Sequence, residues 1–260
     1  MSEYRGVSGV ARKVSKVYRG ISGVARKVKK QYRGVNGVAR KFFGGEPWEE
    51  ALDLVGYNAS SLDAMLKNSS ACAAMAANSS AVSIMKTNYR SQLISYIDSN
   101  WNEGLNLLNY KCGLKCYLFR AGNECSNITG GWAHQEFNAG DGYAQNTGSA
   151  IKVKRECASV TKNKLPLHNF KTITFDAYYD YEYMSSGVEW FRLFSDVNGT
   201  DYHWGYHDTD TPTQLYKYVG AEYDIARTTY SATITTTTNV AVIVQADTDA
   251  GLYVYNIWLN

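Results

Sequence analysis

The residues best suited to chemistry lie in one short aromatic stretch, Tyr202-His-Trp-Gly-Tyr-His-Asp208. If this stretch is a strand, Tyr202, Trp204 and Tyr206 share one face, because side chains alternate along a strand. Flat rings spaced in this way can stack on sugar rings, while the nearby Asp208 carboxylate bonds sugar hydroxyls. The sequence therefore predicts a glycan-binding surface at Tyr202, Trp204, Tyr206 and Asp208. The alternative is that Trp204 and Tyr206 pack the interior of a sandwich.

Paired carboxylates suggest a hydrolase, because glycosidases place two carboxyl groups across the bond that they break. The closest acids are the pairs Asp208/Asp210 and Asp247/Asp249, and Glu189 beside Trp190. The two pairs lie among Thr and Gly residues, which are typical of surface turns. No Gly-x-Ser-x-Gly, His-Glu-x-x-His or phosphate-cradling sequence occurs. We therefore expect no enzyme and no catalytic residues, with calcium binding as a second interpretation of Asp247 and Asp249.

The cysteines do not form a metal-binding pattern. Cys112-x3-Cys116 has no matching second pair, and the four histidines lie outside metal-site spacing. We expect no metal and no cofactor, and five free, buried thiols.

Three regions must position these residues. From residue 111 to 260, period-two alternation between Gly, Asn and Asp turns predicts an antiparallel β-sandwich head. The alternating sets are Ile173, Phe175, Ala177, Tyr179 and Tyr181; Tyr230, Ala232, Ile234 and Thr236; Val240, Val242, Val244 and Ala246; and Tyr253, Tyr255, Ile257 and Leu259. Further candidates for the ligand site in this region are Tyr178, Asp180, Glu182 and Trp190.

Residues 44–110 carry a second pattern, a repeat of ten residues. Asn58, Asn68 and Asn78 each precede a Met by seven positions, at Met65, Met75 and Met85. Ala, Met and Leu favour helix, while Asn and Ser favour helix caps. Two structures fit: one continuous helix to about Asn100, or a string of short helices capped by Asn. We expect a helical stalk or packing layer that self-associates, with the methionines in its core.

Residues 1–43 repeat themselves three times with a period of 14, from Tyr4, Tyr18 and Tyr32. Each unit predicts a β-hairpin, with turns at Ser8-Gly9, Ser22-Gly23 and Asn36-Gly37. This array carries 12 Lys+Arg and one acid, about +11, whereas the remaining residues carry 15 and 23, about −8. Such asymmetry favours an electrostatic anchor for an acidic partner; the alternative is a solvated hairpin face. The expected anchoring residues are Arg5, Arg12, Lys13, Arg19, Arg26, Lys27, Arg33, Arg40 and Lys41.

The array also carries a family resemblance. The tandem YxGVxGVARKVxK units over residues 4–43 resemble those at the start of structural proteins of bacteriophages of Gram-positive bacteria, which are minor virion or tail-associated proteins. The Ser-Ser decads that follow resemble segments downstream of such arrays. The head, over residues 112–260, resembles a jelly roll of the carbohydrate-binding-module type. That resemblance rests on Gly130-Gly131-Trp132, the strand 149–154, the strand 173–181 and the closing 251–260.

Together these features predict a multi-region α+β protein: an N-terminal β-hairpin repeat array, a central helical segment and a C-terminal jelly-roll sandwich. The resemblance implies a phage structural protein, docked to other virion proteins by the array, with a head that contacts host-surface glycan. A homotrimer is expected, because fibres and spikes commonly use that symmetry. A capsid fibre or decoration protein with a purely structural head is the alternative, and a glycan-processing enzyme is the third.

Neither a membrane span nor a signal peptide is expected, because no stretch of 18 apolar residues and no apolar leader occurs. We expect no nucleic-acid partner, since no groove-reading or RNA-binding motif accompanies the basic units. The expected location is the virion, after synthesis in the host cytoplasm.

Overall fold

The computed structural model describes residues 4–7, 10–13, 18–21, 24–27, 31–35, 38–43, 59–136, 142–155, 157–181, 188–194, 213–219, 225–246 and 250–260. For the strands before residue 44 and for 188–194 and 213–219 it describes the backbone alone.

Six strands before residue 44 pair two by two, each pair antiparallel. They are β1 (Tyr4–Val7) with β2 (Val10–Lys13), β3 (Tyr18–Ile21) with β4 (Val24–Lys27), and β5 (Gln31–Val35) with β6 (Val38–Phe43). The register repeats with the sequence: Tyr4 stands opposite Lys13, Tyr18 opposite Lys27 and Tyr32 opposite Lys41. The predicted turns between these strands lie outside the described residues.

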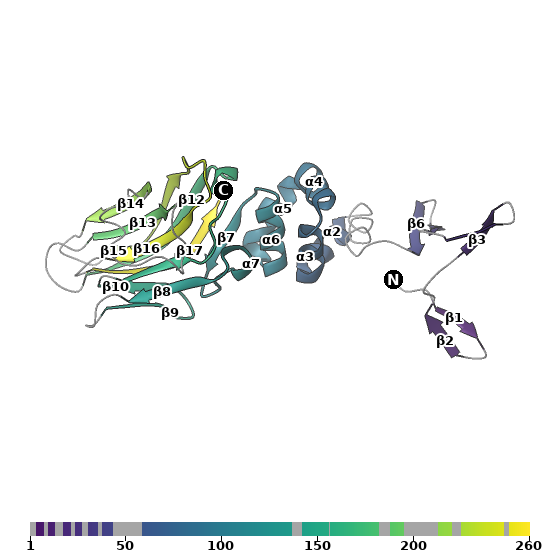
Figure 1. Cartoon of the computed structure of the whole chain (residues 1–260), viewed down its shortest axis with the longest axis horizontal. Helices are drawn as coiled ribbons and strands as arrows, with labels where there is room; N and C mark the ends of the chain where they lie inside the picture. Colours follow the sequence, from purple (N-terminus) through teal and green to yellow (C-terminus); the bar gives the residue numbers. More distant parts are fainter. Residues whose placement is uncertain are drawn as a thin grey trace.

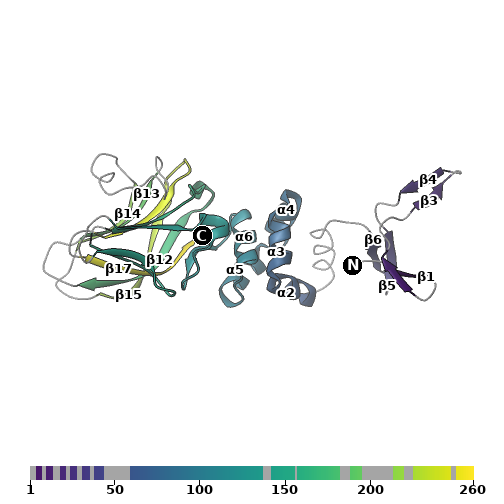
Figure 2. The same ribbon diagram turned by 60° about the horizontal axis from the view of Figure 1, so that its bottom comes forward.

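The helical segment is a string of short helices, which is the second of the two expected structures. The helices are α2 (Ala59–Lys67), α3 (Ser69–Ala76), α4 (Ser79–Asn88), α5 (Arg90–Ser99) and α6 (Glu103–Lys111). Figures 1 and 2 show α5 and α6 next to the sandwich, with α2, α3 and α4 beyond them.

Asparagine caps interrupt what would otherwise be one helix. Asn68 and Asn78 have extended backbones (φ −91°, ψ 103° and φ −119°, ψ 118°), which a continuous helix does not allow. The Asn68 side chain accepts a hydrogen bond from the Ala71 amide at 3.0 Å. The Asn78 side chain accepts from Ser80 and Ala81 at 3.0 and 3.1 Å. Each cap satisfies amides at the start of the next helix, so each decad restarts the helix.

The decad methionines lie in the core of this layer, as predicted. Met65, Met75 and Met85 are buried, and so are Leu62 and Cys72. The layer is tight where α3 meets α6: a Cβ on Gly104 would lie 1.9 Å from the Ser69 carbonyl oxygen. Burial of the apolar side of each short helix therefore holds the layer together.

Two antiparallel sheets form the expected β-sandwich. The first sheet has the order β15 (Ile225–Thr233), β12 (Thr172–Tyr181), β17 (Ala250–Leu259), β10 (Ile151–Lys154) and β9 (Tyr143–Asn146), and β7 (Cys116–Arg120) also pairs with β17. The second sheet has the order β14 (Thr213–Val219), β13 (Val188–Phe194), β16 (Ala241–Ala246), β11 (Cys157–Thr161) and β8 (Trp132–Glu136). Helix α7 (Ser126–Thr129) and the 3-10 turn η1 (Leu167–Asn169) lie in connections, and most connections cross from one sheet to the other.

The predicted alternation holds in β12, where Ile173, Phe175 and Ala177 are buried between the sheets. It fails in β16, where every residue is buried, because this central strand is covered on both faces. In β15 the strand ends at Thr233, so Thr236 lies beyond it. In β17 a bulge breaks the alternation, which places the predicted set Tyr253, Tyr255, Ile257 and Leu259 on two faces.

A polar joint fixes the helical layer to the sandwich. The buried Asn106 amide of α6 bonds both backbone groups of Tyr117 in β7, accepting from the nitrogen at 2.7 Å and donating to the oxygen at 2.9 Å. Arg120 donates to the Ile97 and Asp98 carbonyls at the end of α5. The Tyr117 hydroxyl donates to Asp98 at 2.6 Å, and Lys115 pairs with the same carboxylate at 2.7 Å. Helices and sandwich thus share one boundary that these hydrogen bonds and this ion pair cross.

Candidate ligand-binding face

The predicted glycan-binding residues Tyr202, Trp204, Tyr206 and Asp208 lie outside the described residues, as do Asp210, Glu182 and the pair Asp247/Asp249. Among the companions suggested by sequence, Tyr178 belongs to the first sheet and Trp190 to the second. Asp180 lies in β12, where its backbone alone is described. The structure therefore does not bring Tyr178 and Trp190 into one site.

A different group of side chains gathers on the outer surface of the first sheet, away from the second sheet. We call it the tyrosine face. Its members come from β9, β10, β12, β15 and β17, and all are partly or fully exposed: Tyr143, Lys152, Asp176, Tyr178, Arg227, Tyr253, Tyr255 and Asn256. The register places them side by side, because Lys152 stands opposite Tyr253 on one neighbour and Tyr178 stands opposite Tyr253 on the other.

The bulge in β17 supplies two adjacent members of this face. Ala177 stands opposite Val254 and Asp176 opposite Asn256, so Tyr255 is the extra residue. Val254 is buried, whereas Tyr255 and Asn256 are both partly exposed. The Tyr255 carbonyl accepts a hydrogen bond from the Ala121 amide at 2.9 Å, which satisfies the bulged backbone. Without the bulge, one of these two side chains would point into the core.

At one end of the face, Asp176 and Arg227 form a tied pair. The Arg227 Nε lies 2.8 and 2.9 Å from the two Asp176 oxygens, a second guanidinium nitrogen also contacts Asp176, and the Asn256 amide donates at 3.1 Å. The guanidinium carbon lies 4.0 Å from the centre of the Tyr255 ring. The Arg227 hydrogen bonds hold the pKa of Asp176 below its usual value, against the opposing effect of burial. Asp176 is therefore ionised and neutralised by its partner at neutral pH.

At the other end, Lys152 lies between two tyrosine rings. Its Nζ is 4.2 Å from the centre of the Tyr253 ring and 4.9 Å from that of Tyr143. Tyr253 also contacts Tyr178, with ring centres 5.6 Å apart and planes at 60°. This arrangement combines aromatic surfaces with a positioned cation.

The tyrosine face has the chemistry to bind a flat, polar-edged ligand. Aromatic rings on a sheet surface offer apolar faces to a flat ligand, and amide, guanidinium and ammonium groups offer hydrogen bonds at its edge. Glycoside hydrolysis needs two carboxyl groups placed across the bond. Within the described part of the face the only carboxylate is Asp176, and Arg227 holds it.

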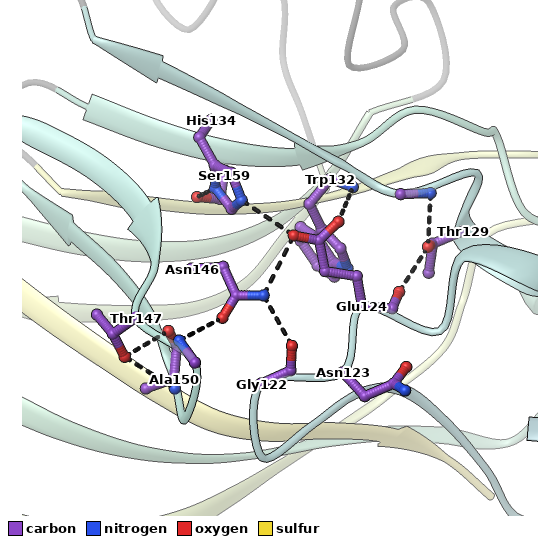
Figure 3. Close-up of polar contacts among 12 residues, drawn as sticks. Gly122, Asn123, Glu124, Thr129, Trp132, His134, Asn146, Thr147, Ala150 and Ser159 are labelled. Carbon is purple, nitrogen blue, oxygen red and sulfur yellow. Dashed lines mark hydrogen bonds and ion pairs between the residues drawn. The ribbon is translucent and has the colours of Figure 1, made fainter. Parts of the chain in front are cut away.

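A second polar group lies around Glu124, in the connection between β7 and α7 (Figure 3). Its carboxylate accepts from the Trp132 amide at 3.1 Å and the Asn146 amide at 3.2 Å, and His134 Nε2 lies 3.4 Å away. Burial alone would raise the pKa of Glu124, but these hydrogen bonds outweigh it and hold the pKa below its usual value. The network joins β8, β9 and the β7–α7 connection.

The same network links a serine, a histidine and a glutamate, in the order Ser159, His134 and Glu124. Ser159 Oγ lies 2.8 Å from His134 Nδ1. A nucleophilic serine must be reachable by substrate, whereas Ser159 is fully buried in β11. Its hydrogen bond instead fixes the His134 ring, and Glu124 anchors the adjacent backbone. The arrangement stabilises the edge of the sandwich and gives no sign of a nucleophile.

The five cysteines are free thiols, all of them buried, as the sequence predicted. Burial raises the pKa of the Cys72 thiol to about 12. In the part of the chain that is described, no cluster of three or more His, Cys, Asp and Glu residues could hold a metal ion. None of the described helices is both long and apolar enough to cross a membrane.

The expected anchoring residues of the array lie in the six paired strands, where the backbone alone is described. The register sets an arginine opposite an arginine in every pair: Arg5 and Arg12, Arg19 and Arg26, Arg33 and Arg40. Lys13, Lys27 and Lys41 stand opposite tyrosines. Like charges directly opposite one another destabilise a strand pair, so this register favours a counter-charge from outside.

Sequence reasoning missed the tyrosine face because its members come from strands far apart in the chain. The available signal was the outward pair of β12, Asp176 and Tyr178, which sets an acid and an aromatic side by side on a partly exposed surface. The rest of the face depends on how β17 pairs with β12 and β10.

No protein-family model matches the chain, and the search of curated proteins finds no match. Solved structures with detectable similarity include the K3 cleaved adhesin domain of Lys-gingipain from Porphyromonas gingivalis, at 10% identity and a TM-score of 0.35, covering 50% of this chain and 90% of that one. They also include a variant of the family 29 carbohydrate-binding module CBM29-2, at 10% identity and a TM-score of 0.35, covering 56% of this chain and 83% of that one.

Proposed function

We propose that this chain is a structural protein of a phage particle, whose jelly-roll head binds host-surface glycan through the tyrosine face. The observation that supports glycan binding is the face itself: Tyr178, Tyr253 and Tyr255 lie on an exposed sheet surface beside polar side chains fixed by their neighbours. A contiguous group of partly exposed aromatic rings is typical of an interaction site, because apolar patches on a surface mark places where a ligand or partner binds.

Sugars fit the chemistry of this face. The axial C–H groups of a pyranose form an apolar surface that can lie on a tyrosine ring, and its hydroxyls can both donate and accept. Arg227, Lys152 and the Asn256 amide offer donors around the rings. The ordered pair of Asp176 and Arg227 is already formed, so little side-chain freedom is lost when a ligand arrives.

The virion part of the proposal is supported by the array. Three basic units in tandem, with arginine opposite arginine in each register, suit docking onto an acidic surface of another virion protein. Several heads on one particle, in a homotrimer or another oligomer, would turn modest single-site affinity into avidity. A capsid decoration protein with a ligand-free head is the second candidate; the same array supports it equally well. We further propose that the chain is not an enzyme and is made in the host cytoplasm.

Glycan binding is tested with the full chain on a printed glycan array, followed by affinity measurement with soluble oligosaccharides that score. Tyr178→Ala and Tyr253→Ala should each weaken binding about fivefold, since an aromatic contact contributes about 1 kcal/mol. The matched control is Tyr89→Ala, which removes a partly buried tyrosine from the helical layer. Thermal unfolding of each variant shows whether the fold is kept. A variant that carries both substitutions, stays folded and binds as tightly as the unchanged chain would overturn the assignment of the face.

The location is tested by immunogold labelling of phage particles that carry this chain, with an antibody against residues 112–260. Label at the tail tip supports a host-binding appendage. Label over the capsid favours the decoration protein instead. Intact and disrupted particles that both stay unlabelled would refute a virion role.

A further inference from the structure

Lys152 carries a charge that no described carboxylate neutralises. The other ions of the tyrosine face, Asp176 and Arg227, neutralise each other. Among the described residues, Lys152 contacts the Tyr143 and Tyr253 rings and no carboxylate. The described part of the face is therefore positively charged at the point where its aromatic rings are closest together.

The position of the ammonium group is set by its surroundings. Lys152 is partly buried in the middle of β10, and one ring lies on each side of its Nζ, at 4.2 and 4.9 Å. A free surface lysine loses much side-chain freedom when it forms an ion pair, which cancels most of the gain. Here the two rings have already restricted the side chain, so an incoming anion meets a positioned partner.

A second cation lies nearby on the same strand. Lys154, two residues further along β10, has its Nζ 5.9 Å from the centre of the Tyr143 ring. Because side chains alternate, Lys152 and Lys154 project from the same face of the sheet. Lys154 is buried, so Lys152 supplies the accessible charge at the Tyr143 end, whereas the Asp176 end carries a neutral pair.

We propose that the tyrosine face selects sugars that carry a negative charge, with Lys152 pairing with a carboxylate or phosphate group while Tyr178 and Tyr253 contact the sugar ring. This inference rests on the glycan binding proposed above and names its ligand class. A neutral sugar would contact the Tyr178 and Tyr253 rings but would form no ion pair with the Lys152 ammonium group. The face would thereby favour acidic glycans over neutral ones of the same shape.

The test uses pairs of ligands in which one member carries an acidic group and the other does not. Trigalacturonate and its trimethyl ester form the carboxylate pair, and mannose 6-phosphate and mannose form the phosphate pair. Affinities for the full chain are measured by calorimetry at 150 mM salt, about the physiological value, to suppress long-range attraction to the basic array. We expect the charged member of one pair to bind about tenfold more tightly, as for a charge-assisted hydrogen bond. The pair that shows the preference identifies carboxylate or phosphate as the group recognised.

Lys152→Gln should abolish that preference while keeping residual binding of the neutral member. Lys171→Gln, which removes the same charge from an exposed lysine just before β12, should leave the preference unchanged. Equal loss in both variants would refute the proposal, because it would show attraction by overall charge. Equal affinity for both members of each pair would refute it as well, and glycan binding by the face would then stand on the tyrosine variants alone. The weakened binding expected of the tyrosine variants tests the proposed function separately.

Discussion

Replacing Asn106 with Leu should destabilise the whole protein, because this side chain completes the edge of the first sheet. Asn106 is 2% exposed, and its amide bonds the Tyr117 amide nitrogen at 2.7 Å and the Tyr117 carbonyl at 2.9 Å. Tyr117 pairs with Trp258 on β17 on its other side. The asparagine amide thus takes the place of a neighbouring strand for one residue.

The size of the effect follows from the groups left behind. Leucine is similar in volume but leaves one N–H and one C=O buried without partners, at about 1–3 kcal/mol each. Added apolar burial offsets about 1 kcal/mol of this. We therefore expect the free energy of unfolding to fall by about 3 kcal/mol, a large part of the 5–15 kcal/mol that is typical of a folded domain.

Urea unfolding measures this change, with tryptophan fluorescence and far-UV circular dichroism followed on the same samples. Asn127→Ala is the control, because Asn127 is exposed and its bond to Glu103 is long, at 3.5 Å. The control should change stability by less than about 0.5 kcal/mol. A loss below about 1 kcal/mol for Asn106→Leu, with an unchanged slope against urea, would refute the reasoning about the buried backbone groups.

Four further outcomes are expected. Asn78→Ala should cost about 1 kcal/mol of stability in urea, since the cap of α4 is lost; a cost near zero would contradict the role of the decad asparagines. Gly104→Ala should lower the melting temperature more than Asn78→Ala does, because its Cβ would lie 1.9 Å from the Ser69 oxygen. The pKa of Glu124 is lower in the folded chain than its ordinary value, so its contribution to stability is present above pH 4.5 and is lost as pH falls through the folded pKa. Glu124→Gln should therefore be less stable than the unchanged chain at pH 7, and its melting temperature should fall less on acidification. The Cys72 thiol, with its pKa raised to about 12, should react with iodoacetamide at pH 8 only after unfolding, and rapid labelling of the native chain, read by mass spectrometry, would contradict its burial.

Local features of the sequence predicted much of the fold. Asn68 and Asn78 act through residues two or three positions away, so their capping could be anticipated from the Asn-Ser-Ser spacing, although not the choice between one helix and several. Met65, Met75 and Met85 repeat at one place in each decad, and all three are buried. In β12 the alternation of apolar and polar residues marked the core side correctly.

The features that escaped prediction depend on contacts between distant strands. The complete burial of β16 depends on its place between β13 and β11 and on cover for both faces, neither of which its own residues reveal. The tyrosine face depends on β9, β10, β12, β15 and β17 being neighbours. Its site is therefore a property of the sheet order, whereas the sequence pointed to an aromatic run within one segment.

The bulge in β17 shows how one strand can serve both the core and the tyrosine face. Before the bulge Leu252 and Val254 are buried, and after it Ile257 and Leu259 are buried, although the two sets are out of phase by one residue. If β17 kept Tyr255 and paired without the bulge, strict alternation would turn Ile257 and Leu259 outward, so the core requires the bulge. The bulge in turn places Tyr255 beside Arg227 and Asn256 beside Asp176. Packing of the sandwich therefore enforces the geometry of the proposed binding face, even where the face itself contributes little to stability.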